Sequence, residues 1–494
     1  MLKKANFTAD SRDLAVGAAL LASLVILSLR VAHGSYLYIE SAMFLHNLLG
    51  PRPFLVKIFD PTGNEIVGYH ARELSYFFNW IDAQFIYYST RLGYPHFFSL
   101  LHIVGLSLIA GFNVFYARRQ FGKGFTRVAV LLSALFLTAP AIFLSNNFLR
   151  TSKIVVATTL FFLLWRLVAL VSRPLERPSR PRLAKLAAWT FALGAVTSLS
   201  DEQGVFLLAL FLGFAAVACW SRPRGKRAES ACFAAALLAA LASYACYNLY
   251  LGPRIIAALG NDLGAYHYQQ VNVVSALADG ANLKEAWGLL MDTLGFQFGS
   301  LDFMTHASSG NRAAGFYPFS TLIALALLSG LALPLLALRG KPQQGRPVEA
   351  FPFAAALTAG AALVVMFAVM IQRHPPVLWE SVRRGYYWIP CAMLVLVAAA
   401  FAAGYSSRVR GTSVLEAALL GILLLNVAEL PAHRRFMEVG LQQVFIDESP
   451  ALRECLRHPE TPLASYPLSP SSSAWCEDYR VLISTVPPAS RKPD

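Results

Sequence analysis

The sequence predicts an all-α integral membrane protein with about eleven membrane-spanning helices. Of its 494 residues, 56% are hydrophobic and only 14% are charged, whereas soluble domains carry roughly 25% charged residues. Uncharged apolar stretches of about 20 residues recur along nearly the whole chain, and this length crosses the ~30 Å hydrocarbon core of a bilayer. The stretches are too long, and too rich in Leu and Ala, for the alternating strands of a membrane barrel. Helices are therefore expected, because they satisfy their own backbone hydrogen bonds inside the bilayer.

The first predicted span lies near the N-terminus. It has full length and lacks a small-residue cleavage site, so we expect a permanent span and not a cleaved signal peptide. The eleven predicted spans are residues 14–32, 97–117, 128–148, 154–171, 183–199, 204–220, 232–251, 318–338, 351–371, 387–405 and 413–430.

Lys and Arg gather in alternate connections between these spans, which predicts the orientation of the chain. The six basic sets fall within residues 3–12, 118–127, 173–185, 222–227, 339–346 and 408–410. The positive-inside rule places all six in the cytoplasm, with the N-terminus inside and the C-terminus outside. The net charge of +14 then reflects topology and contacts with lipid headgroups, and nucleic-acid binding is not expected. Short basic inner loops and an Ala- and Arg-rich composition suggest the inner (plasma) membrane of a bacterium.

The predicted domain organisation is a polytopic transmembrane domain over residues 1–430 and an extracytoplasmic tail over residues 431–494. The long loops, residues 33–96 and 252–317, both lie on the outer face. The inner loops contain no P-loop and no GxGxxG after a strand, so we expect chemistry on the outer face that ATP does not drive directly. In the tail, Cys455 and Cys476 either form a disulfide, which an oxidising compartment permits, or remain two unpaired thiols.

The first outer loop carries two candidate catalytic acids. From about Tyr69 onward, apolar residues recur at helical spacing, which predicts an amphipathic helix lying on the membrane surface. Glu73 and Asp82 are nine residues apart on this helix, so they point to opposite faces and do not form a carboxylate pair. Glu73 is either a solvated charge beside Arg72 or a base over the outer mouth of the helix bundle. We favour Glu73 as the base, with Asp82 as a second candidate.

A second acidic site is the pair Asp201 and Glu202, in a tight outer hairpin between two predicted spans. Acids at a membrane boundary are costly to bury and are often functional. The alternative is a connection that only requires polar residues.

Cations on the outer side run against the positive-inside bias and predict an anionic ligand. Guanidinium groups bind phosphate through two parallel hydrogen bonds, and neighbouring aromatic residues suit the membrane interface or a sugar ring. The alternative is ion pairing with Glu380 or with other loop acids. The candidate phosphate-binding residues are Arg150, Lys153, Arg373, His374, Arg383, Arg384 and Tyr387.

These features together resemble the GT-C superfamily of polyprenyl-phosphate-sugar-dependent membrane glycosyltransferases. The shared features are a long first outer loop with surface helices and an acid, and outer arginines followed by the Arg-x-Tyr-x-x-x-Pro pattern of Arg384–Pro390. The resemblance covers roughly the first seven predicted spans and this pattern. The acidic pair that the superfamily carries near the end of its first span is absent. Its nearest counterparts are Glu73, or Asp201 with Glu202.

The resemblance implies an inverting transfer of a sugar from a polyprenyl phosphate to a lipid, glycan or protein acceptor. Arginines such as Arg373 and Arg384 would hold the phosphate, and Glu73 would take the proton of the acceptor hydroxyl. Some members of the superfamily use a divalent metal, which the sequence neither requires nor excludes. The alternatives are a multi-span transporter or flippase, and a non-catalytic partner protein in surface-glycan assembly.

Overall fold

The structure is a computed structural model of the whole chain. It describes residues 2–33, 45–64, 69–92, 98–172, 179–220, 227–264, 389–410 and 413–440, with short gaps inside some of these ranges, and scattered residues of 451–480.

Throughout the described part of the chain the regular elements are helices. The helices are α1 (Leu2–His33), α3 (Phe54–Ile58), α4 (Pro61–Asn64), α5 (Glu73–Arg91), α6 (Leu100–Phe121), α7 (Thr126–Thr138), α9 (Ser152–Ser172), α10 (Arg180–Ser200), α11 (Glu202–Trp220), α12 (Ala228–Cys246), α13 (Gly252–Ala258), α20 (Ile389–Arg410) and α21 (Ser413–Gly440). Short 3-10 turns are η1 (Lys123–Phe125), η2 (Ser145–Asn147) and η6 (Leu463–Ser465), and η4 (Tyr247–Leu251) is a π-helical segment.

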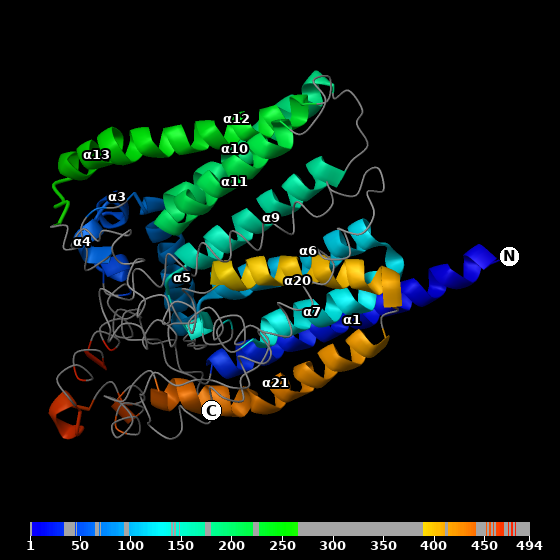
Figure 1. Cartoon of the computed structure of the whole chain (residues 1–494). Helices are drawn as coiled ribbons and strands as arrows, with labels where there is room; N and C mark the ends of the chain where they lie inside the picture. Colours follow the sequence, from blue (N-terminus) through cyan, green and yellow to red (C-terminus); the bar gives the residue numbers. More distant parts are fainter. Residues whose placement is uncertain are drawn as a thin grey trace, which may run out of the picture.

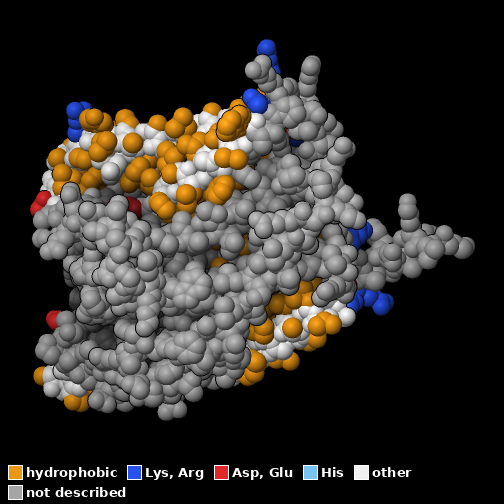
Figure 2. Space-filling view, viewed as in Figure 1, with side chains coloured by type: hydrophobic (Ala, Val, Ile, Leu, Met, Phe, Trp, Pro, Cys, Tyr) orange, Lys and Arg blue, Asp and Glu red, His pale blue; other side chains and the backbone are white. Residues whose placement is uncertain are grey.

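The long helices lie side by side, and α3, α4 and α5 lie across one end of them (Figure 1). We call this end the outer end and the opposite end, where α1 begins, the inner end. Within the described residues, five helices are long and apolar enough to cross a membrane: Ser11–Arg30, Leu100–Phe121, Ser152–Leu170, Arg180–Ser200 and Ala228–Ala258. Apolar side chains cover the exposed flank of the upper helices in Figure 2, as expected for a surface that faces lipid.

The described part of the chain therefore confirms a helical integral membrane protein, but it does not establish the predicted count of eleven spans. Three further described helices, Glu202–Val217, Ala392–Gly404 and Ser413–Ala428, are apolar but shorter. The predicted spans 318–338 and 351–371 lie outside the described residues.

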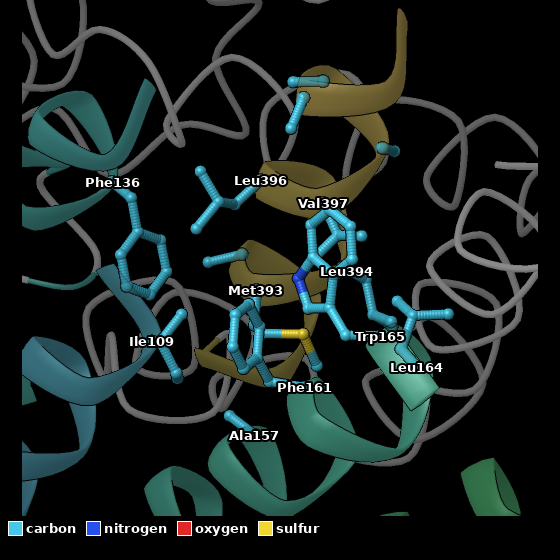
Figure 3. Packing of buried hydrophobic residues seen from close by; sticks show 14 of the residues in the cluster. Ile109, Phe136, Ala157, Phe161, Leu164, Trp165, Met393, Leu394, Leu396 and Val397 are labelled. Atoms are coloured by element: carbon cyan, nitrogen blue, oxygen red, sulfur yellow. The ribbon is translucent and has the colours of Figure 1, made fainter. Parts of the chain in front are cut away.

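The centre of the bundle is a continuous apolar core built by α6, α7, α9 and α20. In Figure 3, Met393 and Val397 of α20 lie close to Phe161 and Trp165 of α9. Buried polar side chains also join helices, and the hydroxyl of Thr197 on α10 donates to that of Thr159 on α9 at 2.7 Å. Such hydrogen bonds hold helices together where water does not compete.

One predicted span has a different boundary. The sequence predicted an apolar helix over residues 128–148, but α7 ends at Thr138, and Ala139 has the extended ψ of 134°. Pro140 follows, and the residue before a proline is disfavoured in the helical conformation. A continuous helix to residue 148 was therefore wrong.

Helix α5 is amphipathic as predicted, and its polar side faces the bundle. Its buried residues are Glu73, Ser75, Tyr76, Asn79, Asp82, Ala83 and Ile86. Phe85 and Tyr88, on the other side, are exposed. This orientation puts an amide and two acids, Glu73 and Asp82, against the outer ends of the long helices. Both acids are buried, although their nine-residue spacing predicted that they point to opposite faces. The aromatic surface on the other side is free to contact lipid.

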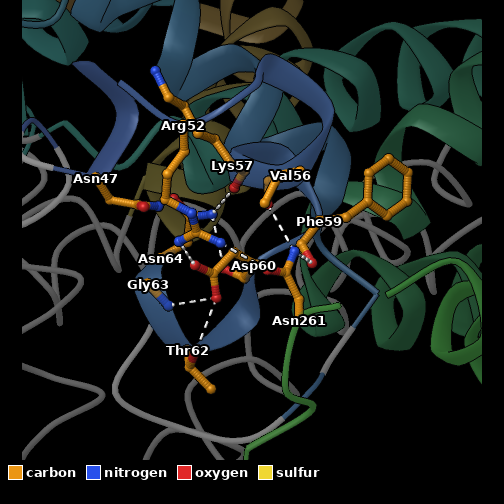
Figure 4. Close-up of polar contacts among 10 residues, drawn as sticks. All are labelled: Asn47, Arg52, Val56, Lys57, Phe59, Asp60, Thr62, Gly63, Asn64 and Asn261. Carbon is orange, nitrogen blue, oxygen red and sulfur yellow. Dashed lines mark hydrogen bonds and ion pairs between the residues drawn. The ribbon is translucent and has the colours of Figure 1, made fainter. Parts of the chain in front are cut away.

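A set of hydrogen bonds joins the first outer loop to the segment after α13 (Figure 4). Asp60 bonds to Arg52 and accepts the backbone N–H of Gly63 at 2.9 Å, and the short helix α4 begins directly after it at Pro61. Arg52 also donates to Asn261 at 2.7 Å, and Asn261 donates to the carbonyl oxygens of Val56 and Phe59. The segment of α3 and α4 is thereby held against the segment that follows α13.

In the C-terminal segment Cys455 and Cys476 form a disulfide, which is one of the two alternatives that the sequence left open. Both cysteines are buried. The guanidinium of Arg480 donates to the backbone carbonyl oxygens of Cys455, His458 and Thr461. The two cysteines therefore form the centre of a small folded unit.

Candidate functional site

Four segments that are distant in sequence meet at the outer end of the bundle. The start of α5 brings Arg72 and Glu73, the first turn of α9 brings Lys153, and the connection between α10 and α11 brings Asp201 and Glu202. The fourth segment is the end of α12 with η4, where Asn248 accepts the backbone N–H of Ala71 at 3.1 Å. We call Arg72, Glu73, Lys153, Asp201 and Glu202 the outer polar cluster.

Asp201 is the electrostatic centre of this cluster. One carboxylate oxygen lies 2.7 Å from Nζ of Lys153, and the other lies 4.0 Å from the guanidinium of Arg72. Burial alone would raise the pKa of Asp201, but the charges of Lys153 and Arg72 and the bond from Lys153 outweigh it and hold the pKa far below its usual value. Asp201 is thus a permanent anion.

The pKa of Glu73 is shifted in the opposite direction from that of Asp201. Its side chain is only 6% exposed, and it faces the phenol groups of Tyr69 and Tyr247. Burial raises the pKa of Glu73 to about 7, although the backbone of Glu73 and the neighbouring phenols of Tyr247 and Tyr69 oppose the shift. A carboxyl group with this pKa exchanges a proton readily near neutral pH.

Asp82 lies apart from Glu73, against the start of α6. It accepts hydrogen bonds from the hydroxyl of Ser99 and, at 3.0 Å, from the backbone N–H of Leu101. Burial raises the pKa of Asp82 to about 7, against the opposing bonds from Ser99, Leu101 and Leu100. These contacts satisfy backbone and side-chain donors in the first turn of α6, which is a capping role.

Of the remaining described candidates, Glu202 and Lys153 belong to the cluster, and Arg150 is close to Lys153 in sequence. Glu202 is half-exposed and lies 3.9 Å from the guanidinium of Arg72. Arg150 directly precedes Thr151, whose backbone N–H and hydroxyl both bond to the side-chain oxygen of Asn79 on α5. Lys153 is predicted to bind phosphate, and in the structure its charge is already balanced by Asp201.

The structure thus brings together Glu73, Lys153, Asp201 and Glu202, and it separates Asp82 from Glu73. Arg373, His374, Arg383, Arg384 and Tyr387 lie outside the described residues. The sequence analysis missed Tyr69 and Tyr247 as neighbours of Glu73, and Arg72 as the link between the two acidic sites. Tyr244 and Tyr247 lie near the end of the predicted span 232–251, where aromatic residues are common at the membrane interface.

Metal binding receives no geometric support from this part of the chain. Among the described residues, no group of three or more His, Cys, Asp or Glu side chains is arranged to hold a metal ion. The use of a divalent metal stays a prediction from the resemblance.

The apolar helices and the outer polar cluster define an all-α integral membrane protein with a charged site at one membrane boundary. No protein-family model and no curated protein matches the chain. Among solved structures, the chain is similar to the crystal structure of ArnT from Cupriavidus metallidurans bound to undecaprenyl phosphate. The sequence identity is 13% and the TM-score 0.45, with 95% of this chain and 76% of that chain covered. ArnT is a GT-C glycosyltransferase.

Proposed function

We propose that the chain is an inverting glycosyltransferase that uses a polyprenyl-phosphate sugar and works at the outer end of its helix bundle. The observation that carries the proposal is Glu73, a buried carboxyl group with a pKa of about 7 that faces the phenols of Tyr69 and Tyr247. Burial of a carboxyl group at a membrane boundary is costly, so its presence favours a functional role.

In the proposed reaction, the hydroxyl oxygen of the acceptor attacks the anomeric carbon of the donor sugar. The new carbon–oxygen bond forms as the bond from that carbon to the phosphate oxygen breaks, and polyprenyl phosphate leaves as the anion. Ionised Glu73 takes the proton of the acceptor hydroxyl. A single displacement inverts the configuration at the anomeric carbon.

The other cluster residues would position Glu73 and balance charge. Asp201 keeps Lys153 and Arg72 in place, and the field of Arg72 would favour the incoming phosphate group. Arg150, Arg373, His374, Arg383, Arg384 and Tyr387 are proposed to complete the phosphate site. The sugar and the acceptor stay open to a lipid, a glycan or a protein.

The test uses purified full-length protein, a synthetic polyprenyl phosphate and its glycosylated form. Glu73→Gln is expected to bind polyprenyl phosphate as the wild type does but to lose transfer by about 10²-fold or more. Arg384→Ala is expected to lose binding of the lipid phosphate. Glu416→Gln on α21 removes a carboxylate from the inner end and serves as the matched control, with transfer unchanged.

A transporter or a non-catalytic partner protein would behave differently. The glycosyltransferase proposal fails if the wild type binds the lipid but neither transfers nor hydrolyses the sugar under any acceptor condition. It also fails if Glu73→Gln and Glu416→Gln have equal transfer rates.

A further inference from the structure

A second site lies at the inner end of the bundle, far from the outer polar cluster. It is a groove with a volume of about 1050 Å³ between α6, α9 and α10. Its floor is one face of α9, formed by Phe162, Trp165, Arg166 and Ala169 at helical spacing, and α9 packs against both other helices. Figure 1 shows α9 between α10 and α6.

The two walls of the groove are also single helix faces. The α6 wall consists of Tyr116, Arg119 and Gln120, in the last turns of that helix. The α10 wall consists of Pro181, Arg182, Lys185, Leu186, Trp189 and Leu193, counted from its first turn. Each wall starts with cations at the inner end and continues with apolar residues toward the middle of the bundle.

The charged residues that line the groove are all basic. Arg119, Arg166, Arg182 and Lys185 line it, and no acidic residue does. Arg182 is paired with Glu229 at 2.8 Å. Arg119 and Lys185 are exposed, and neither makes an ion pair within the described residues. Two cations at the mouth of the groove are thus available to an anion.

The aromatic residues of the groove suit an anion that also has an apolar part. Trp165 stacks on Tyr116 with a ring-centroid distance of 5.4 Å and forms a flat buried surface. Trp189 is 61% exposed and stands on the opposite wall. Aromatic side chains beside cations are typical of the membrane interface, where lipid headgroups meet acyl chains.

We propose that this groove binds one anionic phospholipid of the surrounding bilayer, with its phosphate at Arg119 and Lys185 and an acyl chain along Phe162, Trp189 and Leu193. The groove opens between helices that are long and apolar enough to cross the membrane, so a bilayer lipid reaches it by lateral diffusion. Its cations lie at the ends of those helices and its apolar residues further in, which matches the polarity of a lipid and not that of a soluble anion.

The test is a native mass-spectrometry titration of the delipidated full-length protein with phosphatidylglycerol or phosphatidylcholine of the same acyl chains. Wild type is expected to retain one phosphatidylglycerol preferentially. Arg119→Ala with Lys185→Ala is expected to weaken phosphatidylglycerol binding about tenfold and to leave phosphatidylcholine binding unchanged. The swap Arg119→Lys with Lys185→Arg keeps both charges and should keep the preference.

The matched control is Arg12→Ala with Lys123→Ala, which removes the same charge from exposed positions at the inner end outside the groove. The proposal is overturned if this control loses as much phosphatidylglycerol as the groove variant, or if the groove variant loses none. A third measurement needs no variant: an excess of inorganic phosphate should not displace the lipid. Full displacement would identify a site for a soluble anion and would also overturn the proposal.

Discussion

Lys153 on α9 and Asp201 between α10 and α11 form a buried ion pair with 2.7 Å between Nζ and Oδ1. Their side chains are 5% and 1% exposed. Asp201 also accepts the backbone N–H of Gln203 at 3.0 Å, so the carboxylate shapes the connection in which it lies. The pair therefore fixes the outer end of α9 against the hairpin of α10 and α11.

Removal of one partner of this pair is expected to leave a buried charge without compensation. Lys153→Met should lower the free energy of unfolding by about 3–5 kcal/mol, measured by thermal unfolding in detergent. The double variant Lys153→Met with Asp201→Asn should recover part of this loss, because neither charge remains. Arg127→Ala is the control, because its pair with Asp13 is largely exposed and should contribute at most about 1 kcal/mol. Equal losses in the two single variants would contradict the argument.

The rate of sugar transfer should depend on pH through Glu73. The base must be ionised, and burial raises the pKa of Glu73 to about 7. We expect the transfer rate at saturating donor to rise about tenfold per pH unit below pH 7 and to level off above it. A profile that is flat from pH 5 to pH 8 would exclude Glu73 as the base.

The same raised pKa has a consequence for stability. The carboxyl group is neutral in the folded chain up to about pH 7, whereas its ordinary value is 4.5. The unfolded chain therefore releases this proton first, and folding loses up to about 3 kcal/mol as the pH rises from 4.5 through 7. Glu73→Gln should raise the Tm relative to wild type at pH 8 and not at pH 4.5. A Tm difference that is independent of pH would contradict the assigned environment.

Much of the fold could be predicted from sequence, because long uncharged stretches allow few alternatives in a bilayer. The amphipathic helix α5 and the α10–α11 hairpin follow from local patterns, whereas the pairing of Cys455 with Cys476 was left open. The pairing of Lys153 with Asp201 could not be predicted, because the two residues are 48 positions apart and lie on different helices. The early end of α7 was missed because Pro140 was counted inside an apolar stretch whose length alone suggested a span.

The position of Asp82 predicts that removal of its side chain lowers the stability of the fold and not the rate of sugar transfer. Because it accepts hydrogen bonds at the start of α6, Asp82→Ala should lower the free energy of unfolding by about 1–3 kcal/mol. The transfer rate of the folded variant should stay within a few-fold of wild type. A large loss of transfer with unchanged stability and unchanged lipid binding would instead return Asp82 to the catalytic candidates.

The disulfide offers a direct check on the side of the membrane that carries the tail. Disulfides persist in oxidising compartments, and the positive-inside rule places the tail outside the cytoplasm. In intact cells treated with a reductant and then with a membrane-impermeant maleimide, Cys455 and Cys476 should both be labelled. Without the reductant, neither should be. The control is the double variant Cys455→Ser with Cys476→Ser, in which the four remaining cysteines, Cys219, Cys232, Cys246 and Cys391, should remain unlabelled. If the tail is labelled only after the cells are permeabilised, it lies in the cytoplasm, and the prediction that the C-terminus is outside is wrong.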